Sequence, residues 1–188
     1  FVQTDIVQIS FLFLVLTILL GFIGTLFFIW HSYKATDDAR PGDGVIIQSL
    51  VITDDRKLIM ADYFSEQLKV ASLDDPEEVT GQIDMSDVPC SLALLSNGDV
   101  AVGMEYSNTI DLLKVSGPEP ELLEVLTTGR KYRSVCQASE DELVVGAEGF
   151  HSWDGSIDVI ARDGRFLRTL VSGSNWLVSY PLYLTCRG

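Results

Sequence analysis

Basic side chains are scarce in this sequence, and their scarcity argues against one broad class of main partner. Lysine and arginine together number 13 against 27 aspartates and glutamates, which gives a net charge of −14 and an isoelectric point near 4.3. Proteins whose main ligand is a nucleic acid need clustered Lys and Arg to neutralise phosphates and release counterions. We therefore expect no polyanion as the main partner and interpret the acidity as a solvated surface that keeps the protein soluble.

The residues of common catalytic and metal sites are also few. The two histidines are His31 and His151, and the sequence contains no G-x-S-x-G, no glycine-rich phosphate loop and no H-E-x-x-H. Its three cysteines lack the C-x-x-C or Cys/His spacing of a zinc site. We predict that this chain is not an enzyme and that it holds no metal and no cofactor.

The sequence begins with a long apolar run. The 25 positions from Ile6 to Trp30 carry no charged residue, which is enough for a helix to cross a hydrocarbon core of about 30 Å. We predict a transmembrane segment in residues 1–31, followed by a polar linker over 32–44. Lys34 and Arg40 favour a cytoplasmic side for the rest of the chain. The alternative is a wrongly assembled reading frame, joined to a soluble cytoplasmic domain.

The remaining sequence repeats a unit of four short strands. The unit is clearest between Ser91 and Thr128, where apolar runs alternate with Asn-Gly, Ser-Asn and Gly-Pro breaks. Such punctuated runs are typical of tightly turned antiparallel strands. Aligning the second strands at Leu58, Val100 and Leu143 gives spacings of 42 and 43 residues, as in propeller blades built from four strands.

These units predict an all-β fold, a partial β-propeller that follows a single transmembrane α-helix. Three four-stranded blades are expected over residues 45–89, 90–133 and 134–181, and one strand of a fourth over 182–188. Closed propellers typically have four to eight blades, and unstacked blades leave hydrophobic faces uncovered. We therefore expect the 188 residues to be a fragment of a longer protein.

Cys90, Cys136 and Cys186 each fall at or near the first strand of a unit. A reduced cysteine in such a place acts as a small hydrophobic residue. We predict this role for all three, in preference to a disulfide or a nucleophile. The chain also has no Asn-x-Ser/Thr acceptor, which favours a cytosolic repeat domain.

The repeat resembles the NHL-type β-propeller family, found at the C-terminal end of many tripartite-motif proteins. The third unit carries the pattern best, with LVVGAE from Leu143, SIDVIARDG from Ser156 and RFLRTL from Arg165. The second unit carries SNGDVAVGME and TIDLLKV. The resemblance covers about residues 45–188, and we expect six blades in the complete propeller. It specifies architecture more than activity, because propellers host many unrelated functions.

In a propeller, the loops from second to third strands share one face with the loops between blades, and this face usually binds partners. Aromatic residues are frequent in these loops, and the loop over residues 148–155 is longer than its two counterparts over 63–66 and 105–108. We predict a non-catalytic recognition module, a membrane-tethered propeller that binds a protein partner, and we do not predict its oligomeric state. The predicted contact residues are Tyr63, Phe64, Tyr106, Arg130, Lys131, Tyr132, Phe150, His151, Trp153 and Trp176, with the group 150–153 as the first choice.

Two other functions stay open. The stretch from Arg130 to Arg133 is basic and contains an aromatic, as in NHL propellers that bind single-stranded RNA. It fits the substrate- or RNA-recruiting end of a soluble tripartite-motif ubiquitin ligase. Lactonase-like propellers instead hold a divalent metal with carboxylate and amide oxygens. Residues that supply such atoms, at non-equivalent points of the repeat, are Asp54, Asp55, Glu105, Asn108, Glu148 and Asp154.

Overall fold

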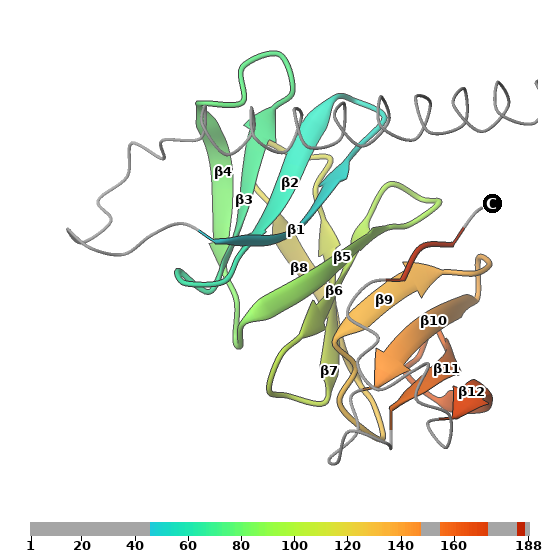
Figure 1. The fold of residues 1–188 in the computed structure, drawn as a ribbon. Helices are drawn as coiled ribbons and strands as arrows, with labels where there is room; N and C mark the ends of the chain where they lie inside the picture. Colours follow the sequence, from blue (N-terminus) through green and yellow to red (C-terminus); the bar gives the residue numbers. More distant parts are fainter. Residues whose placement is uncertain (1–45, 148–154, 173–183, 187–188) are drawn as a thin grey trace, which may run out of the picture. The chain divides into compact units, whose positions relative to one another are not determined.

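The repeated unit folds as a four-stranded sheet. The computed structural model describes residues 46–147, 155–172 and 184–186, in which three such sheets, or blades, form (Figure 1). The first blade contains β1 (Ile47–Ile52), β2 (Lys57–Asp62), β3 (Gln67–Ser72) and β4 (Val79–Asp84). The second contains β5 (Pro89–Leu94), β6 (Val100–Met104), β7 (Thr109–Lys114) and β8 (Glu121–Thr127). The third contains β9 (Ser134–Gln137), β10 (Glu142–Ala147), β11 (Ser156–Ala161) and β12 (Phe166–Ser172).

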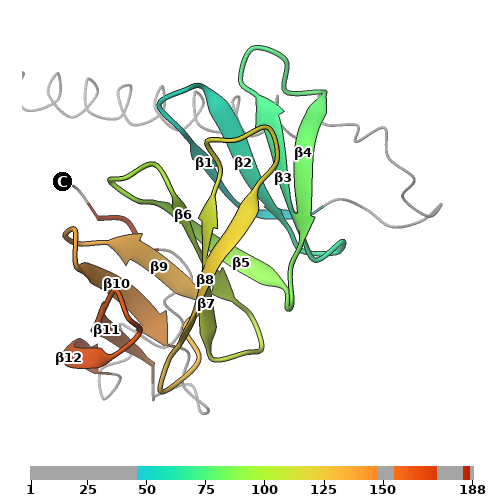
Figure 2. The same ribbon diagram turned by 180° about the vertical axis from the view of Figure 1, so that it is seen from behind.

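Each blade is an antiparallel meander whose strands pair in the order of the sequence (Figure 2). This confirms the prediction of an all-β fold made of propeller-like blades. The transmembrane helix predicted over residues 6–30 lies outside the described residues. Within the part of the chain that the structure describes, no helix is long and apolar enough to cross a membrane.

The hairpin between β5 and β6 shows how the turn residues set the register. Gly98 adopts a φ of 85°, a left-handed conformation that glycine reaches without strain. Asn97 Oδ1 accepts the N–H of Asp99 at 3.1 Å, and the N–H of Leu95 donates to Asp99 O at 2.8 Å. The Asn-Gly pair therefore closes the hairpin that the sequence predicts at this point.

Burial decreases from the middle of a blade to its outer strand. All five residues of β6 are buried, whereas β8 is exposed at every position but one. A strand with neighbouring blades on both faces needs apolar residues at successive positions, as in VAVGM. An outer strand has no strand beyond it in its own blade, and β8 exposes apolar side chains such as Leu122, Leu123 and Val125.

The blades stack through two apolar clusters. The cluster between the first and second blades includes Leu68, Met104 and Leu113. The cluster between the second and third includes Leu126 and Ile160. Each cluster draws on strands of two blades, so neither blade of a pair buries its apolar face alone.

The first strands of the blades, β1, β5 and β9, lie next to one another. Ser49, Ser91 and Ser134 take the same place in these strands, each opposite a small residue of the second strand. Ser49 Oγ accepts the backbone N–H of Leu92 at 3.0 Å. Ser49 thus ties the first blade to the second by a hydrogen bond.

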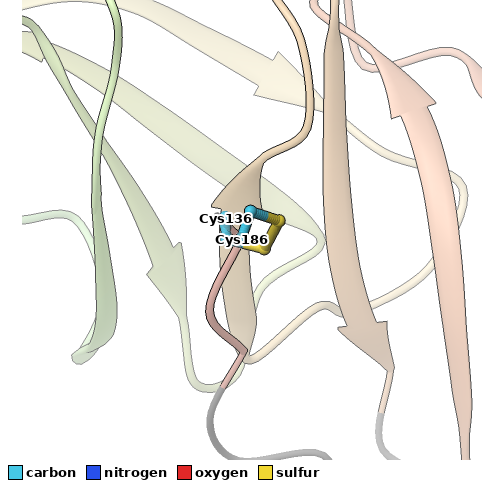
Figure 3. Close-up of a disulfide and its surroundings, with 2 residues drawn as sticks. All are labelled: Cys136 and Cys186. Atoms are coloured by element: carbon cyan, nitrogen blue, oxygen red, sulfur yellow. A yellow bond between two sulfur atoms is a disulfide. The ribbon is translucent and has the colours of Figure 1, made fainter. Parts of the chain in front are cut away.

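A disulfide joins Cys136 on β9 to Cys186, with their Cα atoms 5.7 Å apart (Figure 3). The prediction that these two cysteines are reduced is therefore wrong. They lie 50 residues apart in the sequence, about one repeat, so the stacking of successive units brings them together although no short motif links them. The described residues 184–186 are not part of a strand, so the strand predicted to open a fourth blade is not seen in them.

Cys90, in contrast, is reduced and buried, as predicted. Its thiol donates to Gly103 O at 3.2 Å and to Arg133 O at 3.0 Å. Burial raises its pKa to about 12, which keeps the thiol protonated and unreactive at neutral pH.

Candidate protein-binding surface

Several loops leave the blades at one edge. In a four-stranded meander, the loop between the second and third strands lies at the same edge as the end of the fourth strand, because successive strands run in opposite directions. Hydrogen bonds connect these loops. For example, the N–H of Thr128, which follows β8, donates to Asn108 O in the β6–β7 loop at 2.8 Å. The loop edge, as we name it, comprises residues 63–66, 84–88, 105–108 and 128–133.

Three aromatic side chains from two blades meet at the loop edge, and we name them the aromatic cluster. Tyr63 and Phe64 follow β2, and Tyr106 follows β6. The hydroxyls of Tyr63 and Tyr106 share a hydrogen bond of 3.2 Å, and the rings of Tyr63 and Phe64 lie edge to face with centroids 5.7 Å apart. Phe64 is 55% exposed and Tyr106 is 56% exposed. Exposed apolar rings that gather in this way are typical of binding surfaces.

Asp62 holds the loop that carries Tyr63 and Phe64. This aspartate ends β2 and is 1% exposed. Its Oδ1 accepts the N–H of Phe64 at 3.2 Å, and its Oδ2 pairs with Lys69 Nζ at 3.0 Å. Glu66 closes the turn with a positive φ of 54°. The buried charge is thus paired and hydrogen-bonded, as burial requires.

Asp87 likewise holds the loop that carries Tyr106, by accepting hydrogen bonds from its backbone. Its Oδ2 accepts the N–H groups of Tyr106 at 3.0 Å and Ser107 at 2.5 Å, and its Oδ1 accepts the N–H of Val88 at 2.7 Å. One carboxylate therefore fixes two loops of the edge. Sequence reasoning missed Asp87, because no local pattern shows that the β4–β5 loop contacts the β6–β7 loop.

Ion pairs within the protein neutralise much of the basic stretch. Arg133 pairs with Glu105, and Arg130 Nη1 lies 3.6 Å from Asp158 Oδ2. Lys131 is exposed and forms no ion pair with another described residue. Two of the three cations in this stretch are therefore engaged inside the domain.

Tyr132 lies inside the protein, contrary to the prediction that it contacts a partner. It is 2% exposed and packs in the cluster between the second and third blades. Its hydroxyl donates to Asp158 Oδ2 at 3.1 Å, and burial raises its pKa. The sequence places this ring in a loop between blades, but the loop folds inward and the ring fills the interface.

The described donor residues of the hydrolase alternative, Asp54, Asp55, Glu105 and Asn108, do not converge. Within the described ranges, no group of three or more His, Cys, Asp or Glu could hold a metal ion. Asp54 and Asp55 lie in the β1–β2 loop, at the opposite edge from Glu105 and Asn108. The residues with predicted roles that lie outside the described residues are Glu148, Phe150, His151, Trp153, Asp154 and Trp176.

The second blade holds a buried carboxyl close enough to Asp87 for the two charges to interact. Asp111 on β7 is 2% exposed, and among the described residues its Oδ1 has no hydrogen-bond partner. Burial, and then the charge of Asp87, raise its pKa to about 6. Lys69 and Asp158 take the same place in the other two blades. The aligned strands QLKVAS, TIDLLK and SIDVIA show that this position varies, but they do not show its burial.

Comparison with known proteins establishes the fold alone. No protein-family model and no curated protein matches the sequence. Hydrazine synthase from Kuenenia stuttgartiensis is similar with a TM-score of 0.56 and 15% identity, over 73% of this chain and 38% of that one. The β-propeller domain of Cps50 (Swd1) from Myceliophteria thermophila gives 0.54 and 15%, over 67% and 43%. A nidogen/laminin complex gives 0.53 and 19%, over 68% and 49%. The chain has a β-propeller-like fold and spans less than half the length of each.

Proposed function

We propose that this domain is a non-catalytic recognition module that binds a protein partner through the aromatic cluster. The supporting observation is that Tyr63, Phe64 and Tyr106 come from two adjacent blades to one edge, with two rings more than half exposed. Aromatic side chains provide large contact areas and are frequent among the residues that dominate binding energy. The hydroxyls of the two tyrosines also offer polar contacts at the rim.

The loops that carry the cluster are held by the protein itself. Asp62 and Asp87 bind the backbone of Phe64 and Tyr106, and the Tyr63–Tyr106 hydrogen bond joins the two loops. A surface ordered before binding loses less conformational entropy when the partner arrives. This preorganisation favours recognition by a rigid surface over folding upon binding.

A narrower proposal is that the domain belongs to the NHL-type propellers. The resemblance to this family rests on the repeated strand patterns. The proposal that the domain is the recruiting end of a tripartite-motif ubiquitin ligase rests on the same resemblance. Binding of RNA through the stretch 130–133 has less support than binding of a protein, because Arg130 and Arg133 already form ion pairs within the domain. Metal-dependent hydrolysis has less support because the candidate donors Asp54 and Glu105 lie at opposite edges.

The disulfide bears on the compartment in which the domain works. Disulfides form and persist in oxidising environments and are rare in the cytosol. We therefore propose that the domain faces the extracellular or lumenal side, tethered by the run from Ile6 to Trp30. The bond between Cys136 and Cys186 supports this orientation, whereas Lys34 and Arg40 favour the cytoplasmic one. A domain on the oxidising side would recognise an extracellular or lumenal partner.

Site-specific photo-crosslinking in the full-length protein, expressed in its own cells, tests the binding surface. A photoreactive phenylalanine analogue replaces Phe64, Tyr106 or, as a matched control, Phe166, which is 51% exposed on β12. We expect adducts with the same protein from positions 64 and 106 and none from position 166. The proposal fails if positions 64 and 106 give no adduct, or if all three positions give the same adducts.

A further inference from the structure

The charges around the aromatic cluster indicate which class of protein segment it binds. We infer that the cluster takes a segment rich in arginine and lysine, whose cations lie against the rings and between the acidic groups at the loop edge. This inference rests on the proposed function and specifies the chemistry of the partner.

Three acidic groups at the loop edge form no ion pair with a described residue. Glu66 and Asp84 are exposed at this edge, and Asp87 is half-buried beside Tyr106. Asp84 and Asp87 accept hydrogen bonds from neutral groups, and no described Lys or Arg forms an ion pair with any of the three carboxylates. They therefore keep a net negative charge that can attract a cation in the partner.

The cations nearest the cluster are already engaged. Lys69 is buried in its ion pair with Asp62, and Arg133 pairs with Glu105. Lys131, in the β8–β9 loop, is the exposed cation of this edge that has no ion pair among the described residues. Among the described residues of this edge, an acidic segment would thus meet three unpaired carboxylates and one lysine without an ion pair, whereas a basic segment meets complementary charge.

The rings supply a second interaction that is specific for cations. The face of an aromatic ring attracts an ammonium or guanidinium group, and arginine also stacks on it. Phe64 and Tyr106 are each more than half exposed, so water and partner groups can reach them. Carboxylates beside exposed rings favour cationic side chains more than either group does alone.

Asp111 adds negative charge from the protein interior. Its buried carboxyl is close enough to Asp87 for the two charges to interact, and its Oδ1 has no hydrogen-bond partner among the described residues. A cation that binds at Asp87 reduces the repulsion between these two carboxyls. Basic residues in the partner therefore stabilise the site itself.

Binding of labelled peptides to the full-length protein tests this inference. The probes are three fluorescein-labelled twelve-residue peptides in which Ser alternates with Arg, Lys or Glu, and the measurement is fluorescence anisotropy at several salt concentrations. We expect the Arg and Lys peptides to bind and the Glu peptide not to bind. Phe64→Ala and Tyr106→Ala should each weaken binding of the Arg peptide about fivefold or more, whereas the control Phe166→Ala should not.

A second pair of variants separates local from overall charge. Glu66→Gln with Asp84→Asn removes two charges at the loop edge, and Glu77→Gln with Glu78→Gln removes two exposed charges at the other edge. We expect the first pair alone to weaken binding of the Arg peptide several-fold. Equal weakening by both pairs, no effect of the aromatic variants, or equal binding of the Glu peptide would overturn the inference.

Crosslinking distinguishes this inference from the proposed function. If residue 106 crosslinks to a partner segment that contains no Lys or Arg, the recognition function stands and the inference of a basic segment fails. If positions 64 and 106 give no partner adduct, the recognition function fails as well.

Discussion

The hydroxyl of Tyr132 donates a hydrogen bond of 3.1 Å to Oδ2 of Asp158, inside the interface between the second and third blades. Asp158 is fully buried and also accepts the hydroxyls of Ser156 at 3.0 Å and Thr169 at 2.8 Å. A buried carboxylate needs several such donors, and here hydroxyl groups provide them. The ring of Tyr132 meanwhile fills apolar space, so one side chain contributes both packing and a hydrogen bond.

Shortening Tyr132 should therefore reduce the stability of the domain. We expect Tyr132→Ala to lower the free energy of unfolding by about 3–5 kcal/mol, as for other buried aromatic residues. Tyr132→Phe keeps the packing and should cost about 1–3 kcal/mol through the lost donor. Urea unfolding followed by circular dichroism measures both. Tyr106→Ala serves as the exposed control, and an equal loss for Tyr106→Ala and Tyr132→Ala would contradict the buried role.

The contact between Gly103 and Ser91 predicts a rescue. A Cβ atom at Gly103 would lie 2.7 Å from Ser91 Oγ and 3.3 Å from the carbonyl oxygens of Arg133 and Tyr132. Gly103→Ala should therefore destabilise the domain by about 1–3 kcal/mol. Ser91→Ala should cost little alone, since this hydroxyl has no hydrogen-bond partner among the described residues. The double variant should recover most of the loss, and strict additivity in the double-mutant cycle would show that the two groups do not clash.

The disulfide should be present in the protein purified from its own cells. Without reduction, a thiol-alkylating reagent should modify none of the three cysteines in the folded protein, and after unfolding it should modify Cys90 alone, because Cys136 and Cys186 are bonded. Cys136→Ser should lower the free energy of unfolding by about 2–4 kcal/mol, through the added freedom of the unfolded chain. Alkylation of all three cysteines on unfolding without reductant would contradict the bond and the proposed compartment.

The sequence predicts the blades well because local rules determine them. Turn pairs such as Asn97-Gly98 stop and reverse the strands, and continuous apolar runs mark strands covered on both faces. Both signals recur with the spacing of Leu58, Val100 and Leu143, so the number of strands per blade follows from one repeat.

The site is less predictable because it depends on contacts between repeats. Tyr132 and Tyr106 both lie in loops that follow a strand, but only the three-dimensional packing makes the first buried and the second exposed. Cys136 and Cys186 meet because one unit stacks on the next, and Asp87 reaches Tyr106 for a similar reason. Local sequence patterns do not encode contacts between residues that lie far apart in the chain.

The carboxyl of Asp111 should make stability depend on pH. Burial and the charge of Asp87 raise its pKa from 3.8 to about 6 in the folded protein. Between these two values the folded state binds more protons than the unfolded state, so the free energy of unfolding should decrease as the pH rises from about 4 to 6. Above pH 6 the cost of the buried charge is fully present.

Asn at position 111 mimics the protonated carboxyl and should remove this dependence. We expect Asp111→Asn to be more stable than the natural protein at pH 7, with an advantage that shrinks as the pH falls through 6 and vanishes below about pH 4. The exposed control Asp84→Asn should keep the natural pH profile. Urea unfolding at a series of pH values measures all three proteins. Parallel profiles for Asp111→Asn and the natural protein would mean that water or the partner surface solvates Asp111, and that its burial does not govern its ionisation.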